Sequence, residues 1–158
     1  MLARVLIIAS ALLCPAATAA GQALGSPWFL RIEGGVAQIH SIDVWDPAGA
    51  VRVGRYLDRS RVVGVILSAA GSSADAGYGT LTLGLELQLP GSPRITPTFG
   101  GRAGLLVEEG FAGEILEGSA GLAFRVGTNE WLRIGAQVGR HGGTDGPHAI
   151  LVGYQAPL

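Results

Sequence analysis

The segment from Gly79 to Leu89 alternates leucine with small or polar residues. Leucine occupies the odd positions from 81 to 89, and threonine, glycine, glutamate and glutamine fill the even positions between them. Only an extended strand turns a period of two into two distinct faces, because a helix would distribute the leucines around its circumference. The run exceeds the usual strand of about 5–6 residues and approaches the roughly 9–11 residues with which a tilted strand crosses a bilayer. We therefore predict a long strand with one apolar face.

The same one-sided alternation recurs along the rest of the chain. It predicts strands over residues 28–37, 49–57, 61–70, 78–90, 94–107, 112–126, 131–140 and 148–157. The short connections make neighbouring strands antiparallel, because a parallel crossover needs a dozen residues or more. An even number of antiparallel strands, each with one apolar face, closes into a barrel without free edges. We predict an all-β fold, an eight-stranded antiparallel transmembrane up-and-down β-barrel formed by residues 21–158.

The N-terminal residues 1–20 have the features of a secretory signal peptide. Arg4 supplies the positive charge, residues 5–13 form the apolar core, and Ala17-Thr18-Ala19 provides a small-residue cleavage pattern. The apolar core is too short for a spanning helix. We expect cleavage after residue 19 or 20, and export of the remaining chain.

The single cysteine, Cys14, lies within this predicted signal peptide. The exported chain would therefore have no disulfide and no thiol chemistry. An alternative is that Cys14 becomes the acylated first residue of a lipoprotein, but the bulky Leu13 precedes it where a small residue is expected. That alternative changes the anchor and leaves the barrel prediction intact.

Composition indicates which solvent the exported chain faces. Hydrophobic residues make up 48% of the chain and charged residues only 15%, with 26 glycines, whereas soluble domains carry about 25% charged residues. The formal net charge of -1 argues against nucleic acid as a partner, because nucleic-acid binding needs a basic surface. We predict a protein of the cell outer membrane with lipid against its apolar strand faces. A soluble barrel of the lipocalin kind is disfavoured because it needs a charged exterior.

Charged residues of both signs fall on the polar strand faces. In a barrel of about eight strands the interior is just wide enough for side chains to fill it. We expect these charges to pair inside the lumen and to leave no conducting pore: Arg31, Glu33, Glu86, Arg102, Glu117, Arg125 and Arg133.

Connection lengths and aromatic residues suggest an orientation. The connections at 58–60, 90–93 and 127–129 are short, that at 38–48 is long, and those at 71–76 and 141–147 are intermediate; the short one at 108–111 fits least well. Outer-membrane barrels have short periplasmic turns and longer outer loops. Aromatic residues near the strand ends on the short-turn side predict an interfacial girdle: Trp28, Tyr56, Phe124 and Trp131.

Signals for catalysis are sparse. The sequence has no cluster with metal-ligand spacing, no phosphate-binding loop and no serine in a nucleophile elbow, so we expect no metal and no cofactor. The chain has three histidines, His40, His141 and His148, which all lie in or beside predicted outer loops. Histidine on a surface is more often solvated than catalytic.

The second half of the chain contains several short motifs. They are residues 95–104, residues 108–110, the segment from Leu116-Glu117 to Leu122, the segment from Arg133 to His141, and the closing residues 154–158. Together these motifs, between residues 78 and 158, resemble the lipid A 3-O-deacylase family of outer-membrane acyloxyacyl hydrolases. The resemblance implies an eight-stranded barrel that removes an ester-linked acyl chain from lipid A. It also implies a serine nucleophile that is activated by a histidine two residues before it and a downstream glutamate that orients the histidine.

The catalytic pattern of the family is incomplete in this chain. His141 stands at the histidine, Gly143 at the serine, and His148 at the glutamate, while Thr144 is the nearest hydroxyl. His141, His148 and Thr144 are therefore the candidate catalytic residues that the resemblance implies.

Three functions remain open on the sequence. The first is a non-catalytic barrel of this lineage that is structural or contacts outer-membrane lipid, including lipid A. The second is an active or altered lipid A esterase that uses the three candidate residues. The third is a generic outer-membrane barrel that binds a partner through the loop at residues 38–48, where Trp45 lies between Asp43 and Asp46.

Overall fold

The computed structural model describes residues 26–38, 45–58, 60–72, 77–92, 94–108 and 110–158. The expected signal peptide at residues 1–20 and His40 lie outside these residues. Eight strands follow one another along the chain: β1 (Trp28–Gln38), β2 (Trp45–Tyr56), β3 (Val63–Ser72), β4 (Gly79–Gln88), β5 (Ile95–Glu108), β6 (Phe111–Arg125), β7 (Trp131–His141) and β8 (Thr144–Pro157).

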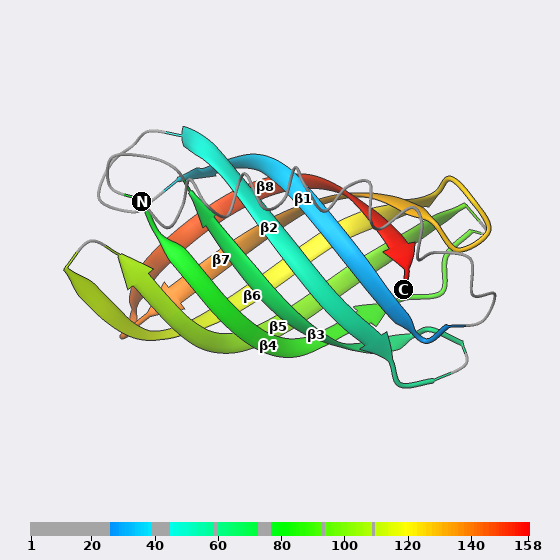
Figure 1. Ribbon diagram of the computed structural model, residues 1–158, viewed down its shortest axis with the longest axis horizontal. Helices are drawn as coiled ribbons and strands as arrows, with labels where there is room; N and C mark the ends of the chain where they lie inside the picture. The colour runs from blue at the N-terminus through cyan, green and yellow to red at the C-terminus, as the bar shows by residue number, and fades with distance from the viewer. Residues whose placement is uncertain (1–25, 39–44, 59, 73–76, 93, 109) are drawn as a thin grey trace.

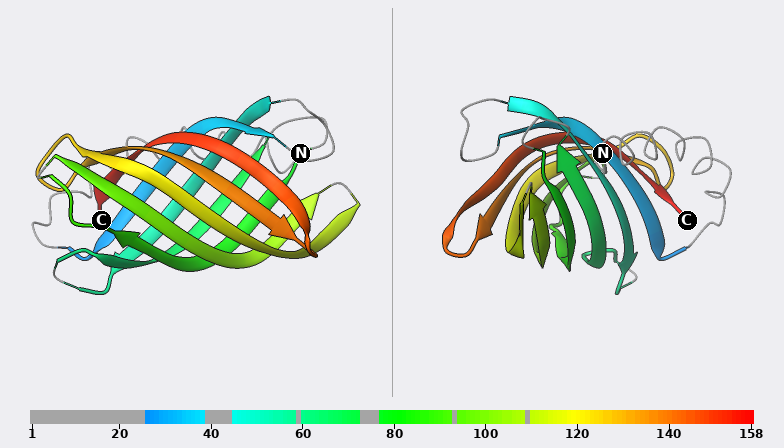
Figure 2. Two further views of the ribbon diagram at one scale, coloured as in Figure 1. Left: turned by 180° about the vertical axis from the view of Figure 1, so that it is seen from behind. Right: turned by 60° about the vertical axis from the view of Figure 1, so that its left-hand side comes forward.

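The strands form a closed barrel in sequence order, and every neighbouring pair is antiparallel (Figures 1 and 2). Strand β8 closes the barrel on β1, with Phe29 opposite Pro157 and Gln38 opposite His148. The predicted fold class is therefore confirmed. Among the described residues, no helix is long and apolar enough to span a membrane.

The leucine strand has the predicted two faces. The five odd-numbered leucines from Leu81 to Leu89, on β4 and at the residue after it, lie on the outside with exposed fractions between 42% and 57%. The even-numbered Thr80, Thr82, Glu86 and Gln88 are buried inside. The other strands add large apolar side chains to the same outer surface. In water such a continuous apolar exterior would be unfavourable, whereas in a bilayer it contacts lipid.

Both described chain ends lie at one end of the barrel, here called the terminal end. The connections β2–β3, β4–β5 and β6–β7 lie there, and the opposite, distal end holds the other four connections. The terminal end is the side that connection lengths predict to be periplasmic, and this orientation stays a prediction.

The prediction that residues 141–147 form a distal connection is wrong. Strand β7 continues to His141 and β8 begins at Thr144, which leaves a two-residue hairpin of Gly142 and Gly143 with φ of 53° and 85°. Two successive residues with positive φ favour Gly-Gly, and such a turn matches the twist of a hairpin. A register shift between Val138 and Arg140 accommodates the beginning of β8. The β5–β6 connection is also only residues 109–110, so the distal connections are not uniformly longer.

Two apolar layers close the interior above and below its charged middle. Phe29, Tyr56 and Ile66 form one buried cluster at the terminal end. The other cluster lies toward the distal end and includes Ala37, Ala50, Ala70, Tyr78, Leu106, Ile115, Ala149 and Leu151.

The girdle prediction is wrong for Tyr56. Its side chain is only 6% exposed and its ring centroid lies 4.9 Å from that of Phe29, inside the barrel. The reason is strand parity: Tyr56 shares its face with the buried Arg52. Trp28, by contrast, is exposed on the outside, with the Arg55 guanidinium 5.5 Å from its ring centroid.

Candidate functional site

The centre of the lumen is organised around Glu86 on β4. Arg31 on β1 donates to both carboxylate oxygens, from Nη1 to Oε2 at 2.8 Å and from Nη2 to Oε1 at 2.7 Å. Arg133 on β7 donates from Nη1 to the same Oε1 at 2.7 Å. Gln155 on β8 accepts hydrogen bonds from Nε and Nη2 of Arg31. One carboxylate thus connects three strands across the barrel.

A second carboxylate, Glu117 on β6, organises the part of the lumen that β4 to β7 line. Its Oε2 accepts from Arg102 Nε at 3.1 Å and from Thr82 Oγ1 at 3.0 Å, and its Oε1 accepts from Gln137 Nε2 at 2.7 Å. The amide oxygen of Gln137 in turn accepts from Arg102 Nη2 at 2.9 Å and from Arg52 Nη2 at 2.8 Å.

Arg52 joins the two halves of the network. Its Nη1 lies 2.9 Å from Glu33 Oε2, and Glu33 Oε1 lies 3.8 Å from Arg31 Nη1. These two Glu33 contacts are ion pairs, and Glu33 Oε2 has no hydrogen-bond partner. The charged hydrogen bonds of Glu86 and Glu117 are strong in a low-dielectric interior and fix the positions of their partners. The network is therefore a continuous polar layer that connects the strands from inside.

Six of the seven residues predicted to pair in the lumen do so. Arg125 is the exception: it lies at the exposed end of β6 and donates to the carbonyl oxygens of Gly127 and Thr128 in the turn. Arg52, Gln137 and Gln155 also belong to the network and were not predicted from the sequence. The alternation Val51, Arg52, Val53 is a signal that could have placed Arg52 inside.

The layer leaves little free volume. A cavity of about 30 Å³ lies beside Arg31, Arg52 and Arg133, which is room for about two water molecules. Together with the apolar layers at both ends, the network fills the described part of the lumen.

The candidate catalytic residues lie around the distal hairpin. His141 Nδ1 is 2.6 Å from the carbonyl oxygen of Glu114, and its ring meets that of Phe111 edge-on at a centroid distance of 4.6 Å. A carbonyl only accepts hydrogen bonds, so Nδ1 carries the proton and Nε2 is the basic nitrogen. The Thr144 hydroxyl donates to the backbone carbonyl of His141 at 2.6 Å.

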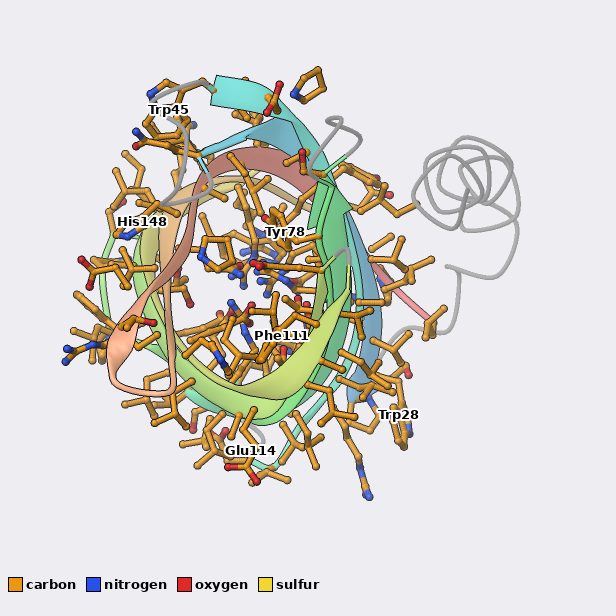
Figure 3. All side chains as sticks on the ribbon, turned by 90° about the vertical axis from the view of Figure 1, so that its left-hand side faces the viewer. Trp28, Trp45, Tyr78, Phe111, Glu114 and His148 are labelled. Atoms are coloured by element: carbon orange, nitrogen blue, oxygen red, sulfur yellow. The ribbon has the colours of Figure 1, made fainter. Side chains whose placement is uncertain are left out.

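His148 lies on the other side of the barrel wall. It sits on β8 opposite Val138 and shares the outward parity of the exposed Ile150. Figure 3, a view onto the distal end, shows His148 outside the wall and Phe111 over the lumen. The structure thus brings His141 and Thr144 together through the backbone and places His148 apart from them. A catalytic role for the three residues stays a prediction.

The loop considered for partner binding is described only from Trp45 onward. Trp45 begins β2 at the distal end and is 47% exposed, and Asp46 follows it in the strand. Asp43 lies outside the described residues, so the arrangement of Trp45 between two carboxylates stays a prediction.

An antiparallel eight-stranded barrel with an apolar exterior and a paired, charged interior is the architecture of outer-membrane β-barrels. The protein is a transmembrane barrel of the cell outer membrane. No protein-family model matches the chain, and no curated protein matches its sequence.

Solved structures match the fold at low sequence identity. Neisserial surface protein A (NspA) matches with a TM-score of 0.68 and 11% identity, over 84% of this chain and 98% of that chain. The N-terminal β-barrel domain of Pseudomonas aeruginosa OprF matches with a TM-score of 0.59 and 14% identity, over 84% and 99%. The outer membrane enzyme PagL matches with a TM-score of only 0.47 and 14% identity, over 81% and 99%. The matches to NspA and OprF support the fold, and none of the similarities assigns an activity.

Proposed function

We propose that the protein is a non-conducting, non-catalytic outer-membrane barrel of the lineage that its sequence resembles, and that it acts by contacting membrane lipid. The network around Glu86 and Glu117 carries this proposal. A conducting barrel needs a continuous aqueous path, whereas the described side chains leave a cavity of only about 30 Å³ in this layer.

The distal hairpin supports the non-catalytic part of the proposal. A hydroxyl becomes a nucleophile when a base within about 2.6–3.2 Å takes its proton. The Thr144 hydroxyl instead donates to a backbone carbonyl. The position that holds serine in the deacylase family is Gly143, which has no side chain.

An apolar groove on the outside supports lipid contact. It has a volume of about 640 Å³ and crosses β4, β5 and β6 on the bilayer-facing wall. Gly101 and Ala103 leave space along its floor, and larger apolar side chains surround them: Leu83, Leu85, Leu87, Phe99 and Leu116. A shallow apolar groove in a wall that faces the bilayer fits a lipid acyl chain. Because no water is displaced within the hydrocarbon, close packing of the chain in the groove would favour this contact through dispersion.

Mass spectrometry of lipid A tests the non-catalytic part. The full chain is expressed in a Gram-negative host, and its insertion is confirmed by outer-membrane fractionation and by a heat-dependent shift in gel mobility. We expect a lipid A spectrum identical to that of the empty host. The proposal would be overturned in favour of the esterase if lipid A lost one acyl chain on expression of the wild type and kept it on expression of the His141→Ala variant.

Photocrosslinking tests the lipid-contact part. The purified barrel is placed in nanodiscs that contain a phospholipid with a photoactivatable acyl chain, and the labelled peptides are identified. We expect enrichment on β4 to β6 and reduced labelling in Gly101→Phe, which fills the groove. The matched control is Ala69→Phe on the outward face of β3, which should leave the pattern unchanged. Equal labelling around the whole barrel would contradict a specific lipid contact.

A further inference from the structure

The buried charges of the lumen do not balance. Among the described residues, the buried ionisable side chains of the lumen network comprise four arginines and three glutamates, which leaves a formal charge of +1: Arg31, Arg52, Arg102, Arg133, Glu33, Glu86 and Glu117. An uncompensated charge surrounded by protein and hydrocarbon is strongly unfavourable. A counter-charge inside the barrel would remove this cost.

The imbalance is concentrated at Arg133. Glu86 accepts both from Arg31 and from Arg133, so two guanidinium groups share one carboxylate. Arg133 Nη1 makes this contact, whereas its Nε and Nη2 are buried without a hydrogen-bond partner. The side chain as a whole is only 4% exposed. Buried donors of a charged group are almost always satisfied, so these two nitrogens indicate an additional ligand.

The cavity of about 30 Å³ lies at the same place. Its walls include Arg133, Arg52 and Arg31 together with Thr98 and Ser119. Three arginines and two glutamates line it, so the walls themselves carry a formal charge of +1. The hydroxyls of Thr98 and Ser119 can turn to donate toward a ligand.

Two facing glycines create this space. Gly121 on β6 is paired with Gly135 on β7, and both have inward parity. A Cβ at Gly121 would lie 2.5 Å from the carbonyl oxygen of Ile134, and one at Gly135 would lie 3.0 Å from that of Ala120. Because neither position admits a side chain without backbone movement, the wall beside Arg133 stays open for a small ligand.

We propose that this cavity binds one small monovalent inorganic anion of the size of chloride. The anion neutralises the +1 charge of the lumen and accepts hydrogen bonds from the two unpartnered nitrogens of Arg133. A water molecule can satisfy one of these donors but supplies no charge. Divalent oxyanions are excluded because their charge would reverse the imbalance and their size exceeds the cavity.

Anomalous scattering from bromide tests the site directly. The full-length mature barrel is crystallised from detergent with bromide as the only halide. We expect an anomalous peak within hydrogen-bond distance of Arg133 Nε and Nη2 and beside Thr98. Peaks only on the outer surface, or two water molecules in the cavity without anomalous signal, would overturn the proposal.

A solution experiment tests the same site without crystals. The midpoint of heat-induced unfolding, read from gel mobility, is compared in sodium chloride, sodium bromide and sodium gluconate at equal ionic strength. A ligand that binds only the folded state raises this midpoint with its concentration. We expect a higher midpoint in both halides than in gluconate, which is too large for the cavity. Equal midpoints in all three salts would overturn the proposal.

Three variants localise the effect. Arg133→Met removes the unpartnered donors and the excess charge, so we expect the halide dependence to disappear. Thr98→Asp supplies a carboxylate in the cavity wall and should also abolish it, which keeps the test informative if Arg133→Met does not fold. The control is Arg94→Met, at an exposed arginine of the terminal end, which should retain the full halide effect. Halide dependence that survives in Thr98→Asp or is lost in Arg94→Met would contradict the assignment.

Discussion

Glu86 Oε1 lies 2.7 Å from Arg31 Nη2 and 2.7 Å from Arg133 Nη1. A single oxygen on β4 therefore connects β1 and β7, which are not its neighbours in the barrel. The main-chain hydrogen bonds connect only adjacent strands, whereas this contact crosses the lumen. Glu86 thus has a structural role that the backbone alone does not provide.

Replacement of Glu86 by glutamine should destabilise the barrel substantially. Glu86→Gln keeps the shape of the side chain but leaves two buried guanidinium groups without their carboxylate, and removing one partner of a buried ion pair costs about 3–5 kcal/mol. We expect a loss of this size in the free energy of unfolding, measured by urea titration of the barrel in lipid vesicles.

The matched control is Glu114→Gln. Glu114 is exposed on the outward face of β6, where substitutions usually change stability by no more than about 0.5 kcal/mol. If both variants lost the same small amount, the cross-lumen role of Glu86 would be wrong.

The filled lumen predicts that the barrel does not conduct ions. With Phe29, Tyr56 and Ile66 closing the terminal end and the charged layer in the middle, we expect no single-channel steps when the purified barrel is inserted into a planar bilayer. Insertion is confirmed in parallel by protease protection of the barrel in vesicles. Reproducible conductance steps from inserted protein would show that the network opens.

The β2–β3 turn predicts a pH dependence at the terminal end. Asp58 accepts hydrogen bonds from the backbone N–H groups of Val63 at 3.0 Å and Val62 at 3.2 Å. Both bonds lower the pKa of Asp58 below its usual value, and the bond from Val63 has the larger effect. Because the folded-state pKa is depressed, the stabilisation is present above the unfolded pKa of about 3.9 and is lost as the pH falls through the folded pKa.

Asp58→Asn tests this turn. We expect the variant to unfold at lower urea than the wild type at pH 7, and the difference to shrink as the pH falls below about 4. The two proteins are compared in vesicles at matched ionic strength. A difference that does not depend on pH would mean that the charge of Asp58 contributes nothing to the turn.

The sequence predicted the barrel because a period of two is a local property of each strand. Leu81 to Leu89 and the paired Glu86 follow directly from it. The first error ignored this same local property. Tyr56 was assigned to the girdle from its position at a strand end, although its parity places it inside.

The distal hairpin was misjudged for a different reason, because pairing across strands decides where it lies. Residues 142–147 are rich in glycine and include a proline, which favours a loop in any local analysis. In the structure Thr144 pairs with His141, and a register shift carries Pro147 into the strand. The two consecutive glycines were the available signal for a tight hairpin. The positions of His141 and His148 on opposite sides of the wall follow from strand parity, because His141 shares the face of the buried Arg133 and His148 shares the face of the exposed Ile150.

The last prediction rests on the placement of His141 and His148 on opposite sides of the barrel wall. Gly143→Ser combined with His148→Glu restores the residue types that the deacylase family carries at these positions. We expect no deacylation of lipid A, because residue 148 faces outward while the ring of His141 lies over the lumen against Phe111. A glutamate at 148 therefore cannot orient the imidazole, and Nδ1 is already bound to the Glu114 carbonyl. Lipid A mass spectra of the folded double variant provide the measurement. Removal of an acyl chain would mean that the hairpin rearranges into an active site. Only these two residues would then separate the wild-type protein from an active deacylase.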